Sequence, residues 1–167
     1  RNMGGDRVCI ATTWSWPCDV CMQSVVIRDA APNDFEAICL LNLAEVQHTS
    51  SMDWARLVAL DNLSYLHKVG CVDNQVAAFL LAMCNDAVYE NSNFEWFARR
   101  YPRFMYVDRI VVSSGFRELG LGSRLYEELF RCARHSGIPL VTCEYNIVPA
   151  NEPSRVFHEK FGFREQG

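Results

Sequence analysis

The stretch from Arg117 to Gly122, Arg-Glu-Leu-Gly-Leu-Gly, has the residue types of a phosphate-binding turn. It follows an apolar segment and opens a segment with the periodicity of a helix. The first turn of a helix has unpaired backbone N–H groups, and the helix dipole favours negative charge there. Glycine lets the backbone approach a diphosphate closely, while Arg117 and the Ser123 hydroxyl add hydrogen-bond donors. We therefore expect this turn to hold a diphosphate.

Two other nucleotide-binding motifs do not fit. A P-loop requires Gly-Lys-Ser/Thr, and the sequence here is Gly122-Ser123-Arg124, which argues against nucleotide hydrolysis. A dinucleotide fingerprint needs three glycines after the first strand of a domain, and this turn has two, late in the chain. One alternative stays open from these residues alone: a glycine-rich turn that only lets a helix pack on a sheet.

The turn must be positioned by segments with strand and helix patterns, which alternate along the chain. Strands are predicted at 25–28, 66–72, 75–83, 104–112 and 139–145, with a hairpin turn at Asp73-Asn74. Helices are predicted at 35–41, 52–60, 120–135 and 151–161, and a short one at 94–99 inside a polar excursion. The alternation predicts an α/β domain.

Composition limits the classes of function. The chain has 167 residues and a formal net charge of −4, and half its residues are hydrophobic, which suits one domain with a sizeable core. The sequence has no clustered basic surplus of the kind that binds nucleic acid, and no apolar run near the roughly 20 residues of a membrane span. Five of its eight cysteines lie in apolar segments as small hydrophobes, which favours a reducing, cytoplasmic setting.

Residues 1–21 lack any sustained period, and we expect a flexible extension ahead of a folded domain at 22–167. Cys18 and Cys21 have the spacing of half a zinc site or of a redox pair. No second pair or histidine cluster follows at zinc spacing, and the βαβ context of a redox motif is missing. An accidental pair is the preferred interpretation, and no metal is expected.

Two blocks of sequence resemble one known family. Residues 110–125, Ile-Val-Val-Ser-Ser-Gly-Phe-Arg-Glu-Leu-Gly-Leu-Gly-Ser-Arg-Leu, resemble the central acetyl-CoA motif of the GNAT superfamily of N-acetyltransferases. Residues 151–163 resemble its closing helix, Asn-x-x-Ala/Ser-x-x-Phe-Tyr-x-Lys-x-Gly-Phe. The resemblance covers about residues 25–163 and is greatest to uncharacterised predicted bacterial members.

The resemblance implies a mixed, mostly antiparallel sheet flanked by helices, with two central strands that splay apart. It implies acetyl-CoA as co-substrate, with the pantetheine arm pairing to the backbone of Ile110, Val111 and Val112. The residues implied to hold the pyrophosphate are Arg117, Glu118, Leu119, Gly120, Leu121, Gly122 and Ser123. Asn151 would contact the pantetheine or cap the last helix.

The family normally continues with two more strands, which would follow Phe163. We therefore expect either a truncated chain or a partner that supplies the missing edge, and so a homodimer or a marginally stable domain.

Acetyl transfer needs a base for the amine, a polarised thioester carbonyl and a proton for the leaving thiolate. A backbone N–H of Val111 or Val112 would polarise the carbonyl. Glu144 matches the base of family members that acetylate protein N-termini, and its alternative is a strand-end carboxylate satisfied by hydrogen bonds. Asp108 is the second candidate base, and its alternative is an ion pair with a neighbouring arginine.

The proton donor is where this sequence departs from the family. His158 stands where the family usually has tyrosine, and it either donates a proton or only shapes the pocket. Tyr145 and Tyr106 are alternative donors. The departure keeps open a second function, a non-catalytic acyl-CoA-binding module. For an enzyme, the acceptor would be a small amine, an amino acid or a protein N-terminus, with the first two helices and residues 83–104 lining its side.

Overall fold

The computed structural model describes residues 23–46, 49–145 and 150–166, so the extension and its cysteine pair lie outside the described residues. The elements are β1 (Val25–Asp29), η1 (Pro32–Asp34), α1 (Phe35–Ala44), α2 (Trp54–Leu63), β2 (Leu66–Val72), β3 (Gln75–Cys84), α3 (Ser92–Ala98), β4 (Met105–Val112), η2 (Ser114–Leu119), α4 (Leu121–His135), β5 (Val141–Cys143) and α5 (Glu152–Lys160). Here η marks a 3-10 helix.

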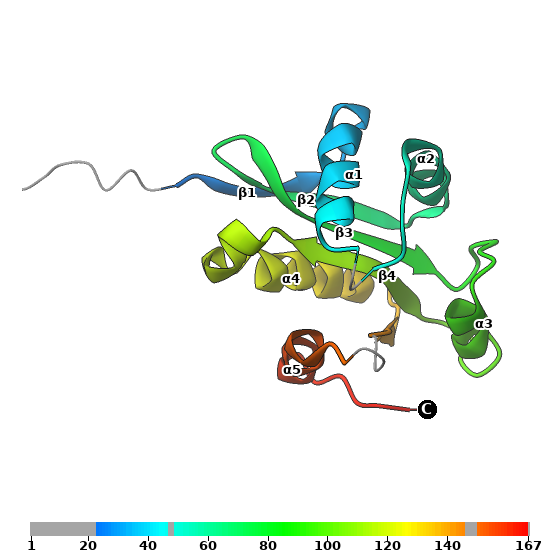
Figure 1. Cartoon of the computed structure of the whole chain (residues 1–167). Coiled ribbons are helices and arrows are strands. Elements are labelled where there is room, and N and C mark those ends of the chain that lie inside the picture. The colour runs from blue at the N-terminus through cyan, green and yellow to red at the C-terminus, as the bar shows by residue number, and fades with distance from the viewer. Residues whose placement is uncertain (1–22, 47–48, 146–149, 167) are drawn as a thin grey trace, which may run out of the picture.

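The sheet has five strands in the order β1-β2-β3-β4-β5. The first four pair antiparallel and β5 pairs parallel to β4, so the predicted mixed, mostly antiparallel sheet is confirmed. Helices α1 and α2 lie on one face, while α4 and α5 lie on the other (Figure 1). This is the flanked sheet that the resemblance implied.

Each face of the sheet has its own apolar core, because side chains of a strand alternate between faces. Phe79 and Leu81 of β3 pack in the core beneath α1 and α2. Leu80 and Ala82 pack in the core with Leu125 of α4. The buried strands β3 and β4 thus fix both helical layers relative to one backbone.

The hairpin turn between β2 and β3 confirms the prediction at Asp73-Asn74. Both residues have positive φ, 48° and 65°. Asp and Asn tolerate this left-handed region better than most residues, and such turns match the twist of a hairpin.

Strand β5 is shorter than the predicted 139–145. Pro139 has no N–H to give to a ladder, so pairing starts after it. At the other end, Cys143 is the last residue paired with β4, and Glu144 and Tyr145 already leave the sheet. The early end of β5 leaves the second half of β4 without a neighbour on that side among the described residues.

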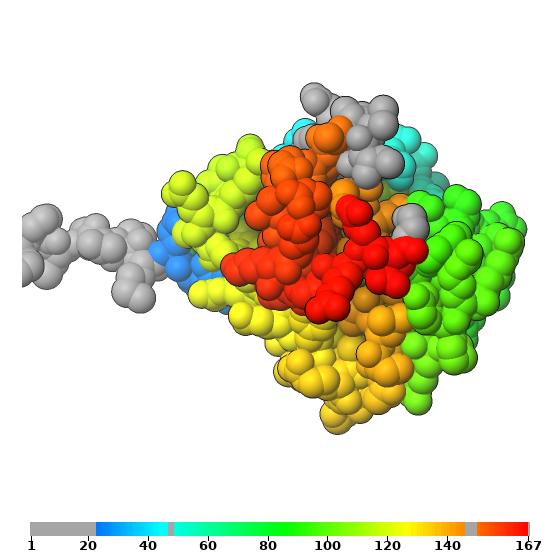
Figure 2. Space-filling model, turned by 90° about the horizontal axis from the view of Figure 1, so that it is seen from below, coloured from blue at the N-terminus to red at the C-terminus, as the bar shows by residue number. Residues whose placement is uncertain are grey.

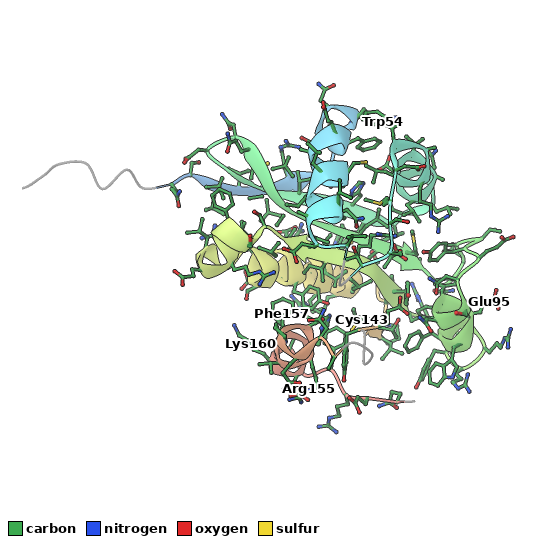
Figure 3. The ribbon with its side chains drawn as sticks, in the orientation of Figure 1. Trp54, Glu95, Cys143, Arg155, Phe157 and Lys160 are labelled. Carbon is green, nitrogen blue, oxygen red and sulfur yellow. The ribbon has the colours of Figure 1, made fainter. Side chains whose placement is uncertain are left out.

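Helix α5 and the residues after it lie across the molecule next to α4 (Figure 2). An aromatic cluster holds the two helices together: the ring of Tyr126 in α4 lies 5.0 Å from that of Phe157 and 5.1 Å from that of Phe161. Phe157 points from α5 toward α4, whereas Arg155 and Lys160 point away from it (Figure 3). The last helix is therefore part of the packed domain.

Within the described ranges, no helix is long and apolar enough to cross a membrane. The same residues hold no group of three or more His, Cys, Asp or Glu side chains that could bind a metal ion. The five cysteines among them, Cys39, Cys71, Cys84, Cys132 and Cys143, are free thiols.

Candidate active site

The site begins where β4 and β5 part. The two strands pair from Met105 to Val107 on β4, opposite Val141 to Cys143. On its other side, β4 skips one residue against β3, since Leu81 pairs with Arg109 and Ala82 with Val107. Asp108 is therefore an extra residue in a β-bulge, which bends a strand and ends regular pairing. The backbone edge from Ile110 to Val112 faces the gap.

At the far end of β4, η2 and Gly120 lead into α4. Gly120 has φ +69° and no side chain that could cap the helix. Amides of Arg117, Glu118 and Leu119 lie within a 3-10 helix, whose amides bond to carbonyls three residues earlier. The first amides of an α-helix have no partner inside it, so those of Leu121, Gly122 and Ser123 are the donors open to an anion.

The two glycines of the turn have different roles. A Cβ built on Gly120 would meet nothing within 4 Å, so this residue is glycine for its left-handed backbone. A Cβ on Gly122 would lie 3.2 Å from the Phe157 ring and 3.5 Å from Val112. Gly122 is thus glycine because α5 packs closely there. The alternative in which a glycine only lets a helix pack therefore holds for Gly122 and not for Gly120.

Arg117 reaches across the chain to α1. Its Nη2 lies 3.2 Å from both carboxylate oxygens of Glu45. The Arg117 side chain is 56% exposed and that of Glu45 is 16% exposed. An ion pair this open to water contributes little to stability, so the guanidinium can exchange partners easily.

Glu144 lies directly after β5, at the gap. Its carboxylate reaches solvent, yet protein surrounds it closely, and this burial raises its pKa. Tyr106 lowers that pKa and the negative Asp108 raises it, so both lie near Glu144. The Tyr106 hydroxyl is buried and has no close hydrogen bond to a described residue, although it lies near enough to Glu144 to lower the pKa of that carboxyl. Burial, then the Glu144 charge, raises the pKa of Tyr106 far above its usual value.

Asp108 is already engaged. Tyr89 donates a hydrogen bond to one carboxylate oxygen, and Arg109 Nε lies 3.2 Å from the other. The Asp108 side chain is only 5% exposed. This is the ion pair with a neighbouring arginine that the sequence left open as an alternative, and it leaves less of the carboxylate for an incoming amine.

His158 is buried, with both ring nitrogens occupied. A carbonyl oxygen can only accept, so Nδ1 donates to the Ser154 oxygen at 2.7 Å. Nε2 must then accept from the Tyr126 hydroxyl, also at 2.7 Å. Burial lowers the pKa of His158, which keeps the ring neutral. These contacts favour the interpretation in which His158 shapes the pocket and docks α5 on α4.

Asn151 and Tyr145 also have partners in the protein. The Asn151 side chain accepts from the Ser154 amide at 3.2 Å and caps α5, the second of its two expected roles. The Tyr145 hydroxyl donates to Glu165, which raises the pKa of the tyrosine. Of the three candidate proton donors, Tyr106 is the one without a close hydrogen bond to a described residue, and its hydroxyl lies near Glu144.

Residues 35–163 match the model of the acetyltransferase (GNAT) family. The chain belongs to this family. A search of curated proteins gave no significant match. Among solved structures, Ard1 from Thermoplasma volcanium is similar at 19% identity and a TM-score of 0.70, over 86% of this chain and 84% of that one.

Two further solved structures share the GNAT fold with this chain. Aminoglycoside N-acetyltransferase AAC(6')-Iy, in complex with CoA, has 16% identity and a TM-score of 0.66, over 87% of this chain and 91% of that one. An acetyltransferase of Trypanosoma brucei has 19% identity and a TM-score of 0.62, over 86% of this chain and 95% of that one. At such identities the similarity establishes the fold.

The contacts of Arg109 near the candidate site were not predicted from the sequence. Arg109 is buried and bonds to Asn42 of α1 and to Ser50, which precedes α2. A charged pair, Asp108-Arg109, inside an apolar strand was the signal available, because charges are rarely buried without partners. The sequence offered no way to find those partners, which lie 59 and 67 positions away.

Proposed function

We propose that this GNAT protein transfers the acetyl group of acetyl-CoA to a primary amine by direct attack in a ternary complex. One observation carries the proposal: the open edge of β4 runs from the gap at Glu144 to the uncapped start of α4. A cofactor with a thioester at one end and a diphosphate at the other fits such an arrangement. The CoA complex of a protein with this fold supports it.

The chain's own residues have distinct tasks toward the cofactor. The backbone of Ile110, Val111 and Val112 pairs with the pantetheine arm as a further strand would. The diphosphate binds at the amides of Leu121, Gly122 and Ser123, in a refinement of the wider set expected from the sequence. Arg117 leaves Glu45 and adds charge-assisted hydrogen bonds.

Glu144 is the base that takes the proton of the attacking amine. The amine nitrogen forms a bond to the thioester carbon, and a backbone N–H of Val111 or Val112 stabilises the oxyanion. The carbon–sulfur bond then breaks, and the thiolate takes a proton. Tyr106 is the donor we favour, since its buried hydroxyl lies close to Glu144 and has no close hydrogen bond to another described residue. The free cysteines support a cytoplasmic setting.

A free-thiol assay tests the proposal against the non-catalytic alternative. That alternative remains open because both ring nitrogens of His158 have protein partners. The chain is mixed with acetyl-CoA and a panel of an aminoglycoside, amino acids and short peptides with free N-termini. Thiol release that depends on an amine supports the enzyme. Binding of acetyl-CoA without release on any amine would instead favour an acyl-CoA-binding module.

Gly120→Ala should weaken CoA binding about tenfold, because a left-handed L-residue costs about 1–2 kcal/mol and the turn relaxes away from its binding geometry. Calorimetry with CoA measures the change. Gly115→Ala is the matched control, since Gly115 is in η2 just ahead of the turn, has open space around its Cβ position and has no positive φ. Equal affinity in both variants would show that the turn does not hold the cofactor.

Glu45→Gln should lower the KM for acetyl-CoA about two- to threefold at low ionic strength, since it frees Arg117 and removes a negative charge that repels the diphosphate. Added salt should erase the difference, because exposed charges are screened. Glu95→Gln removes a more exposed carboxylate that is also paired with an arginine, Arg99, on α3 at the other end of the molecule (Figure 1), and should change nothing. A higher KM in Glu45→Gln would mean that Glu45 helps the arginine to bind.

A further inference from the structure

Arg109 has an unusual environment for a cation. The residue is 6% exposed, and its guanidinium has four acceptors around it. Nε contacts Asp108 at 3.2 Å, and Nη1 donates to the Asn42 side chain at 2.8 Å and to the Ser50 carbonyl at 2.6 Å. Nη2 donates to the Ser50 hydroxyl at 2.6 Å. A buried charge is tolerated only with such partners, so this set is fixed in place.

Three of these four contacts go to two residues on either side of the connection between α1 and α2: one to Asn42 in α1 and two to Ser50 ahead of α2. Asn42 is in the last turn of α1, and its amide also donates to the Ser50 carbonyl at 3.1 Å. Thr49 donates to the Asn42 side-chain oxygen at 3.2 Å. The two ends of the connection are therefore joined to each other and, through Arg109, to β4.

Four described residues of this connection, Val46, Ser51, Met52 and Asp53, form one wall of a hollow on the α1 and α2 side. The hollow is lined by Asn42, Leu43, Val46, Ser51, Met52, Asp53 and Arg56. Its lining carries one carboxylate and one guanidinium beside three apolar side chains. Neither Arg109 nor Ser50 is in that lining, so both act on the hollow only through the segment that they hold.

The anchor of this wall is also at the reaction site. Arg109 directly follows the bulge residue Asp108 and precedes Ile110, where the open edge of β4 begins. Its positive charge lowers the pKa of Glu144, which places it close to that carboxylate. Strand β4 thus provides the backbone edge proposed to pair with the cofactor, and its Arg109 side chain holds the wall of the hollow.

We infer that Arg109 is a positioning residue that, through Ser50, fixes residues 50–53 as one wall of the acceptor site. That this wall belongs to the site of the acceptor amine rests on the proposed function. The wall takes an amine that carries an apolar group, because Leu43, Val46 and Met52 line the hollow with balanced charge. A polycationic amine would require an excess of carboxylates there.

Steady-state kinetics of Arg109→Lys and Ser50→Ala test the inference. Lysine keeps the charge near Glu144 but cannot form the forked contacts, so the KM for the amine should rise about tenfold, the value of one charge-assisted hydrogen bond. Ser50→Ala removes a single acceptor and should give a smaller rise. The KM for acetyl-CoA should stay within about twofold in both, a split that general destabilisation would not produce. Arg131→Lys, at an exposed pair with Glu128, is the control.

Hydrogen exchange supplies a readout that needs no activity. Amides of Arg56 and Leu57, which bond to Asp53 at the end of the connection, should exchange faster in Arg109→Lys than in the wild type, while amides of α4 should not. Unchanged exchange at Arg56 and Leu57, or an equal rise in both KM values, would overturn the inference. If the wild-type chain transfers no acetyl group to any amine, the proposed function fails and the acceptor role of the wall fails with it. Exchange then still decides whether Arg109 holds the segment.

Discussion

Glu144→Gln is expected to lower kcat by about two to four orders of magnitude, the usual contribution of a general base. The amide of glutamine has nearly the shape of the carboxylate but cannot accept the proton of the amine. Because burial raises the pKa of Glu144, the wild-type rate should fall as pH drops through that raised pKa. The variant should lose this acid limb, which a pH profile of kcat/KM measures.

The same variant should not be less stable than the wild type at neutral pH. A carboxyl group whose pKa is higher in the folded state than in the unfolded state makes folding less favourable as pH rises. A neutral glutamine removes this cost. Glu127→Gln, at an exposed position of α4, is the matched control. A Glu144→Gln enzyme with wild-type kcat and pH profile would assign the base elsewhere.

His158→Ala is expected to lower the free energy of unfolding by about 3 kcal/mol, or about 10 °C in Tm for a domain of this size. The change empties a buried aromatic position and leaves the Tyr126 hydroxyl without its acceptor. Thermal unfolding followed by circular dichroism measures the loss. A Tm within a degree or two of the wild type would contradict the docking role assigned to His158.

His158→Phe and Tyr126→Phe separate docking from catalysis. Phenylalanine keeps most of the packing, so kcat per folded molecule should stay near that of the wild type in both variants. The pKa of His158 is lower in the folded state than in the unfolded state, so its contribution to stability is lost as pH falls below the unfolded value. His158→Phe should therefore be less sensitive to acid. A large loss of kcat with a shifted pH profile in His158→Phe alone would restore the histidine as the proton donor.

The sequence was most informative where local chemistry decides the structure. The left-handed turn at Asp73-Asn74 and the helix at α4 follow from residue types and short-range periodicity. The order of helices and strands was likewise predicted, because apolar period and turn residues mark them. The match between the chain and the GNAT family confirmed the resemblance that rested on two sequence blocks.

The site was harder to predict, because its details depend on contacts between distant segments. The sequence could not show that Gly122 faces Phe157. It also could not show that the Tyr126 hydroxyl bonds to Nε2 of His158, 32 positions away. It also treated all amides from Arg117 to Gly122 alike. The structure places the first of them in a 3-10 helix, which leaves fewer donors for an anion.

The close approach of Phe157 to Gly122 has a consequence for the C-terminal part of the chain. The first turn of α4 has two roles. Its amides face the proposed diphosphate, and the lack of a side chain at Gly122 makes room for the Phe157 ring of α5. Shortening the protein ahead of Phe157 would take away the support behind that turn. If the turn holds the diphosphate as proposed, we expect α5 to influence coenzyme affinity from behind the turn.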